Sequence, residues 1–397
     1  MAANKKTLGD IAKFYRGLTY SKGDEVEFSS KAVLRSNNVE LETNSLVLSD
    51  LKYLRDDLDI DDDKKVKTNS ILICMSNGSK QHIGKVAFIK DNLDLAFGGF
   101  MGLILPDHKV NAKYVYYSCI SSAFKHFLSG VGNGIGITNL RFTDLSTFTF
   151  PVPATAEQER IVAELDCLSD IIEKQKQQLK ELDNLAQSIF YTTFGDPISN
   201  NFGWELKQLG NCFCHIKNGA NIKQEKGAGG IPITRIETLS GGVFNRDRLG
   251  YADLQEVGKY EKYVLNTGDL LLSHINSKVY IGRTVAYRKV GNEKIIHGMN
   301  LLRLIPNADT IHPIYMQYFS YTDMFKGQIA NRRKDAVNQS SISVADLKTV
   351  SIPIPPFALQ QEFASKVDAI EKQKEIIKQS IEETETLFNS RMDYYFN

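Results

Sequence analysis

The feature that most constrains this chain is an internal repeat with an offset of 202 residues. The stretch TFTFPVPATAEQERIVAELD, residues 147–166, aligns without a gap on TVSIPIPPFALQQEFASKVD, residues 349–368. In this register a Pro-x-Pro motif falls on a second one, and Gln158 falls on Gln360. At 397 residues the chain is also too long for one ordinary core. The fold must therefore accommodate two similar halves.

Each repeat opens a long amphipathic segment. Core-type residues recur at alternating steps of four and three, which is the spacing of a coiled-coil seam. Each segment predicts a helix of about 39 residues, roughly 58 Å long. A stripe this narrow cannot bury itself alone, so we expect the two helices to pair, although an ordinary bundle helix is the alternative. The predicted seam residues are Ile161, Leu165, Leu168, Ile172, Leu179 and Leu182 in the first helix, and Phe363, Val367, Ile370, Ile377, Ile381 and Phe388 in the second.

Local signals mark the first helix and both seams. Thr155 is a candidate N-cap with Gln158 as its capping-box partner, and Gly195 is a candidate stop. Polar Gln175 and Lys374 interrupt the two seams at different points. Buried polar interruptions can define register at some cost in stability.

The segments between the helices repeat more faintly. LGDIAKFYRG at 8–17 resembles LGNCFCHIKNG at 209–219, and SKQHIGKVAF at 79–88 resembles SKVYIGRTVAY at 277–287. Short β-type runs flanked by Asn, Gly and Ser turns, each followed by a helical stretch, predict mixed α+β domains on small twisted sheets. The predicted plan alternates a globular domain with a long helix, with boundaries at 1–150, 151–196, 197–352 and 353–397.

The net charge of +1 conceals a segregated distribution. Residues 197–352 carry 20 Lys and Arg against 13 Asp and Glu, whereas the helical segments 151–196 and 353–397 are acidic, with 4 against 9 and 5 against 8. Positive charge gathered in one part of a chain indicates polyanion binding by that part.

Polar residues that suit nucleic acid recur in the loops of both halves. Lys and Arg neutralise phosphates and contact guanine, while Asn and Gln match adenine. Each of these residues could equally be a solvated surface group, but their recurrence at matching places favours binding. The candidates are Lys80, His82, Lys85, Asn133 and Arg141 in the first half, and Lys278, Tyr280, Arg283, Arg332, Arg333, Lys334, Asn338 and Gln339 in the second.

We expect no catalytic or metal site in this chain. Asp196, Glu205 and Lys207 have a nuclease-like order, but a spacing of this kind arises often by chance. Cys212 and His215 have no second ligand pair at zinc spacing. Five scattered cysteines and a start without an apolar signal core favour the cytoplasm, and no apolar run suits a membrane span.

The whole arrangement resembles the specificity subunits of type I restriction–modification systems. The resemblance rests on the Pro-x-Pro entry to the heptad helix, on SIFYTTFGDPISNNFGWELKQLG at 188–210, on the SKQHIGK and SKVYIGR loops, and on DLKTVSIPIPP at 346–356. Leu359 before Gln360 departs from the usual Glu-Gln.

The resemblance implies two target-recognition domains, each reading one half of a bipartite, asymmetric DNA sequence. It implies that the two helices pack antiparallel as a spacer and dock two modification (methyltransferase) subunits. S-adenosylmethionine would then belong to those subunits, and ATP and Mg to the restriction subunits. The alternatives are a protein- or RNA-interaction scaffold and a self-contained nuclease or methyltransferase.

Overall fold

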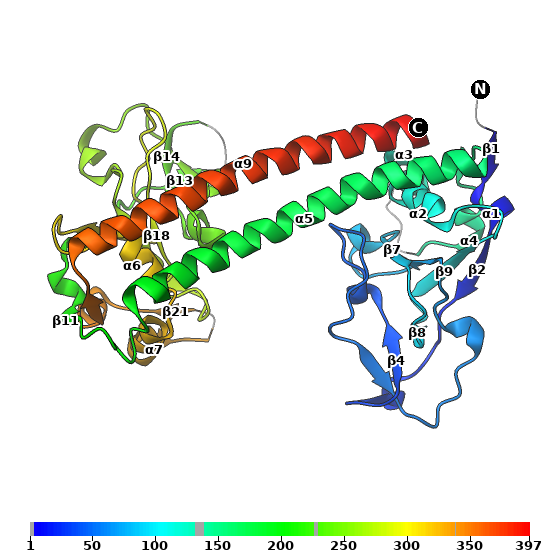
Figure 1. Ribbon diagram of the computed structural model, residues 1–397, viewed down its shortest axis with the longest axis horizontal. Helices are drawn as coiled ribbons and strands as arrows, with labels where there is room; N and C mark the ends of the chain where they lie inside the picture. Colours follow the sequence, from blue (N-terminus) through cyan, green and yellow to red (C-terminus); the bar gives the residue numbers. More distant parts are fainter. Residues whose placement is uncertain (1–3, 132–138, 226–228, 338) are drawn as a thin grey trace. The chain divides into compact units, whose positions relative to one another are not determined.

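The computed structural model divides into two compact units, each containing part of both long helices (Figure 1). Unit 1 comprises Met1–Lys176 and Lys378–Asn397, and unit 2 comprises Gln177–Ile377. The structure describes residues 4–131, 139–225, 229–337 and 339–397.

Unit 1 is built on a four-stranded antiparallel sheet with the strand order β2-β9-β6-β7. A second sheet has the order β3-β5-β4-β8, and β1 pairs with β10. The elements are β1 (Lys5–Thr7), α1 (Leu8–Ile11), β2 (Ala12–Arg16), β3 (Glu25–Val26), β4 (Lys31–Leu34), β5 (Lys52–Leu54), β6 (Ser70–Cys74), β7 (Val86–Ile89), β8 (Leu95–Phe97), β9 (Met101–Pro106), α2 (Ala112–Ile120), α3 (Ser122–Gly130), α4 (Phe142–Leu145), β10 (Thr149–Pro151) and α5 (Thr155–Phe194).

Unit 2 is built on an antiparallel sheet with the order β12-β19-β16-β18. It also contains the sheets β13-β15-β14, β17-β21-β20 and β11-β22. The elements are β11 (Glu205–Gln208), β12 (Phe213–Asn218), β13 (Gln224–Glu225), β14 (Ile231–Ile233), β15 (Gly250–Ala252), β16 (Leu270–Leu272), β17 (Ile275–Asn276), β18 (Thr284–Ala286), β19 (Leu302–Pro306), α6 (Pro313–Phe319), α7 (Asp323–Arg332), β20 (Lys334–Asp335), β21 (Ser340–Ser341), α8 (Val344–Lys348), β22 (Ser351–Ile354) and α9 (Phe357–Phe396).

The two units share one framework, which confirms the predicted duplication of α+β domains. The main sheet of each unit has the same strand order. After its last strand the chain forms a pair of helices, then a third and shorter helix, and then the strand that leads into a long helix. The apolar runs at 71–73 and 270–272 are fully buried in the inner strands β6 and β16. Strands buried on both faces tolerate such continuous apolar sequences.

Aromatic side chains attach the long helices to the globular part of each unit. In unit 2 the ring of Phe190 stacks on Tyr315 at 5.6 Å, and Phe363 contacts Tyr318 edge-on at 5.2 Å. In unit 1 the ring of Phe396 lies 5.0 Å from Tyr114. Burial of rings this large supplies much of the apolar stabilisation of both joints.

The glutamine that repeats at offset 202 is the hydrogen-bonding counterpart of these aromatic contacts. In unit 1 the Gln158 amide accepts from the backbone of Asn111 at 2.9 Å and donates to the carbonyl of Pro153 at 2.7 Å. In unit 2 Gln360 accepts from His312 at 2.8 Å and donates to Pro355 at 2.9 Å.

The predicted capping box at the start of α5 is therefore wrong. Thr155 is the first residue of α5 rather than its cap. The Gln158 side chain reaches the start of α2, a tertiary partner that a local motif cannot reveal.

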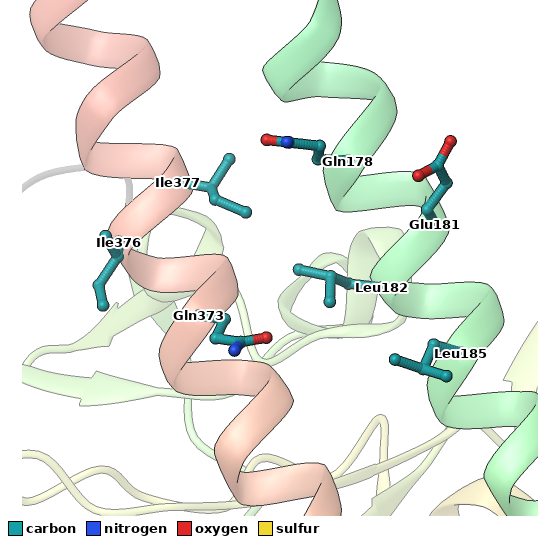
Figure 2. Close-up of a pocket in the computed structure, with 7 residues that line it drawn as sticks. All are labelled: Gln178, Glu181, Leu182, Leu185, Gln373, Ile376 and Ile377. Atoms are coloured by element: carbon teal, nitrogen blue, oxygen red, sulfur yellow. The ribbon is translucent and has the colours of Figure 1, made fainter.

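The two long helices pack antiparallel in each unit. In unit 1 Arg391 pairs with Glu164, and Gln175 donates to the Ser380 hydroxyl at 2.7 Å. In unit 2 Figure 2 shows Leu182 and Ile377 pointing into the space between α5 and α9. Every predicted seam residue is buried or half-buried. The predicted antiparallel pairing is confirmed within both units.

Both polar interruptions of the seams have partners. Lys374 is almost fully buried, and its Nζ contacts Asp183 at 2.7 Å and Glu371 at 2.8 Å. Removing one partner of a buried charge is costly, so such pairs penalise any shift of the helices along each other. No helix of the described residues is long and apolar enough to cross a membrane.

Truncation of the α9 seam should destabilise unit 2 strongly. Phe363→Ala removes a fully buried ring and should cost about 3–5 kcal/mol. Trp204, the single tryptophan of the chain, lies in unit 2 and donates to the Phe194 carbonyl, so its fluorescence during urea unfolding reports on this unit. Ile376→Ala on the same helix is the control, because Ile376 is 68% exposed. Equal midpoint shifts for both variants would refute the packing described here.

Candidate nucleic-acid interface

In unit 2 a small sheet brings two predicted loops together. Strand β21 lies between β17 and β20, so the loop that follows β17 is adjacent to the segment that follows α7. Asp335 links them, because its carboxylate contacts Lys278 Nζ at 3.0 Å and Arg333 Nε at 2.9 Å. The hydroxyl of Ser340 donates to the same carboxylate at 2.6 Å. We call this group of loops the unit 2 hairpin, comprising residues 275–283 and 333–341.

The electrostatics of the hairpin keep Asp335 ionised. The Ser340 hydroxyl, followed by Lys278 and Arg333, lowers the pKa of Asp335 to about 2. A depressed carboxylate pKa stabilises the folded state above the ordinary value of about 4, and this contribution is lost as the pH falls towards 2. The hairpin therefore keeps this carboxylate charged between about pH 2 and pH 4, where an ordinary Asp becomes protonated.

Four of the five basic candidates in the second half differ in their surroundings. Lys334 is exposed on β20, and Lys278 is exposed although paired. Arg333 is half-buried against Asp335. Arg332 ends α7, where it donates to the Thr349 hydroxyl at 2.9 Å and to the Gln328 carbonyl at 3.1 Å. Its guanidinium thus binds its own unit, which favours a structural role.

Tyr280 and Arg283 form a stacked pair. The Arg283 guanidinium lies 4.5 Å from the Tyr280 ring centre, and its Nη1 donates to the Leu239 carbonyl at 3.3 Å. Tyr280 is 43% exposed and the neighbouring Val279 is 85% exposed. Exposed rings and guanidinium planes are the surfaces on which nucleic-acid bases stack. Gln339 is also exposed, whereas Asn338 lies outside the described residues.

Unit 1 brings the equivalent loops together. Asn139 bridges to Ser76, and Leu140 donates to the Met75 carbonyl at 2.7 Å, as Ile342 does to His274 at 2.9 Å in unit 2. Arg141, which follows this bridge, is exposed. Residues 139–140 therefore lie beside residues 75–76, which follow β6. Asn133 lies outside the described residues.

The SKQHIGK loop of unit 1 divides into surface and interior residues. Lys80 is exposed and His82 is half-buried in the turn Lys80–His82. Lys85 is buried, and its Nζ donates to the Val39 carbonyl at 2.7 Å. Burial lowers the pKa of this ammonium. Lys85 therefore does not belong to the exposed surface and holds the neighbouring loop in place.

Two features of the loops escape sequence reasoning. Asp335 has the wrong charge for a phosphate contact, yet it organises the hairpin through Lys278, Arg333 and Ser340. Phe100 is 71% exposed, and its carbonyl accepts from Met75 at 2.9 Å and from Ser76 at 3.2 Å, which places an aromatic ring beside the unit 1 loop. The sequence does mark the turn of each loop by a glycine in the matching IGK and IGR motifs. These glycines, Gly84 and Gly282, both have positive φ, at 83° and 85°.

The geometry is that of a binding surface. In the described part of the chain no group of three His, Cys, Asp or Glu residues could hold a metal ion. The exposed groups of the unit 2 loops are cations, an amide and the Tyr280 ring, together with the Val279 side chain and the Asp335 carboxylate.

Comparison with known proteins identifies the family of this chain. The family model described as "Type I restriction modification DNA specificity domain" matches twice, over residues 3–184 and 201–386. The EcoKI specificity subunit of Escherichia coli K12 is 23% identical over 91% of this chain and 82% of that protein. The putative MjaX specificity subunit of Methanocaldococcus jannaschii is 39% identical, over 45% of this chain and 43% of that protein.

Solved structures share the fold. The specificity subunit from M. genitalium superimposes with a TM-score of 0.56 at 14% identity, over 99% of this chain and 96% of that one. A chain from a structural study of type I restriction–modification complex assembly gives 0.57 at 17% identity, over 99% and 97%. With one match in each half, this chain belongs to the type I restriction modification DNA specificity domain family.

Proposed function

We propose that this chain is the non-catalytic DNA-reading subunit of a type I restriction–modification complex and that it acts in the cytoplasm. Each unit reads one half of a bipartite, asymmetric target. The observation that carries the proposal is that both halves match the specificity-domain family and both bring the same two loops together. A scaffold for protein or RNA finds no such support.

The residues of the loops suit base and phosphate contacts. Lys278 and Lys334 offer ammonium groups to phosphates or guanine, and Gln339 offers an amide that matches adenine. In unit 1 the corresponding exposed residues are Lys80 and Arg141. A shared framework with different loop residues fits two readers of different half-sites.

The two long helices have the length and the mutual packing expected of a spacer. Both α5 and α9 contain 40 residues, and their seams are closed by each other in both units. We propose that the helix pair sets the number of base pairs between the half-sites.

Each unit has a surface depression at the matching place, as expected if two copies of one partner bind. In unit 1 it lies between Pro106 at the end of β9 and Val162 of α5, and in unit 2 between Pro306 at the end of β19 and Phe357 of α9. We assign it to two modification subunits, which would bring S-adenosylmethionine, and restriction subunits would add ATP- and Mg-dependent cleavage.

Methylation mapping tests the proposed function. Adenine methylation in host DNA should mark a two-part asymmetric sequence, and deletion of this chain should abolish it. Methylation that persists unchanged would contradict the proposal.

Loss of the exposed hairpin lysines should weaken DNA binding in a salt-dependent manner. For the assembled methyltransferase carrying Lys278→Ala and Lys334→Ala, the slope of log K against log salt should become shallower by about 0.9 for each DNA phosphate that these lysines neutralise. The control is Lys289→Ala with Lys326→Ala, which removes the same charge from exposed positions outside the hairpin. Binding curves identical to wild type at every salt concentration would exclude the hairpin as a DNA-binding surface.

Shortening the helix pair should change the gap between half-sites only. Deleting one heptad from α5 (173–179) together with one from α9 (376–382) keeps the seam in register and shortens the pair by about 10 Å. At about 3.4 Å per base pair this corresponds to about three base pairs. Mapping of methylated adenines should show the same two half-sites with a smaller gap. A change in the half-site bases would refute the spacer role.

A further inference from the structure

Unit 2 contains a basic pocket that the proposed DNA-reading loops do not include. It has a volume of about 340 Å³ and lies against the strand pair β12–β19 and the turn Gly258–Tyr263. Lys217, Lys262 and Arg303 line it, together with Tyr263 and His297. No carboxylate is among the described residues of its lining.

Arg303 forms the buried wall of this pocket. It is nine-tenths buried, its Nη2 pairs with Asp269 at 2.6 Å, and its Nη1 donates to the Lys262 carbonyl at 3.3 Å. Its Nε has no hydrogen-bond acceptor in the described part of the chain. A buried donor without an acceptor is costly and calls for an explanation, such as an unseen ion.

The fold itself does not require charge at this place. Register pairs Lys217 with Arg303 in unit 2, and Tyr15 with Leu103 at the equivalent place in unit 1. Leu103 is fully buried in an apolar cluster that Tyr15 packs against. An apolar pair therefore suffices for the shared framework. Burying an ion pair generally stabilises a fold less than apolar residues of similar volume, so the cations indicate a ligand.

The other two cations of the lining are lysines. Lys217 and Lys262 are exposed, and the Lys262 ammonium lies 5.2 Å from the Tyr263 ring centre. Asp269 neutralises Arg303, so the two lysines give the pocket a net positive charge. His297 donates from Nε2 to the Leu301 carbonyl at 2.8 Å, which leaves Nδ1 as an acceptor in its neutral form.

We propose that this pocket binds a phosphate group. Arginine and lysine donors line this pocket, and the one carboxylate that pairs with them, Asp269, lies behind Arg303 and outside the lining. Such donors match the acceptor oxygens of phosphate. The group can come from free phosphate or from the DNA backbone. The second source rests on the proposed function. It is favoured by Asn218 of the pocket, whose Nδ2 lies 3.4 Å from Nε2 of His274, the residue that precedes the hairpin strand β17.

The test uses the purified full chain and inorganic phosphate at constant ionic strength. Phosphate at ten times its dissociation constant should raise the Trp204 unfolding midpoint by about 3 °C. Lys217→Met with Lys262→Met should remove this rise. Lys289→Met with Lys326→Met, which removes equal charge at exposed positions outside the pocket, should retain it.

A second variant separates binding from folding. Lys217→Tyr, Asp269→Ser and Arg303→Leu together install the residues that unit 1 has at the equivalent places, Tyr15, Ser70 and Leu103. This variant should unfold cooperatively without any response to phosphate.

Salt-dependent binding of target duplex by the assembled methyltransferase identifies the source. If the pocket holds a backbone phosphate, Lys217→Met with Lys262→Met should make the slope shallower by about 0.9. If it holds free phosphate, the slope should stay and only the midpoint response should disappear. A variant that matches wild type in both measurements overturns the proposal. If the hairpin lysine variants bind DNA as the wild type does, that result counts against the DNA-reading function. It does not affect the phosphate proposal, which the unfolding midpoint tests separately.

Discussion

The structure depends on the fact that neither long helix can bury its apolar stripe alone. Leu165 and Phe363 are fully buried because α5 and α9 cover each other and the globular part of each unit. Lys374 lies in the same seam with Asp183 and Glu371 around its ammonium. Sliding one helix would separate this charge from its partners, so apolar burial provides the stability and the polar contact defines the register.

Apolar burial and polar pairing also act together where each long helix joins the globular part of its unit. Tyr114 donates to the Pro151 carbonyl at 2.8 Å, and Tyr315 donates to Pro353 at 2.6 Å. With Gln158 and Gln360 these bonds satisfy backbone groups where a strand turns into a long helix. Buried polar groups of this kind must be paired, so these bonds constrain the direction in which each long helix starts from the strand before it.

Duplication with divergence explains how one framework supports two surfaces. The strand order and the loop-to-loop bridge are common to both units. The side chains on that frame differ: Lys217 and Arg303 stand where unit 1 has Tyr15 and Leu103. Such exchanges keep the strand order while they replace an apolar pair with charged residues on one face of the sheet, which is how a recognition domain can acquire a new ligand.

The sequence by itself determined the duplication, the two helices with their seams, and the family, because periodicity and repeats are local properties of the chain. Only the tertiary structure decided which loop residues face solvent. Lys85 and Arg332 look like surface cations in the sequence, yet they bond to Val39 and Thr349, and Asp335 organises a basic hairpin. Those outcomes depend on strand register and on contacts between distant segments, since the environment of a side chain is set across strands rather than along them.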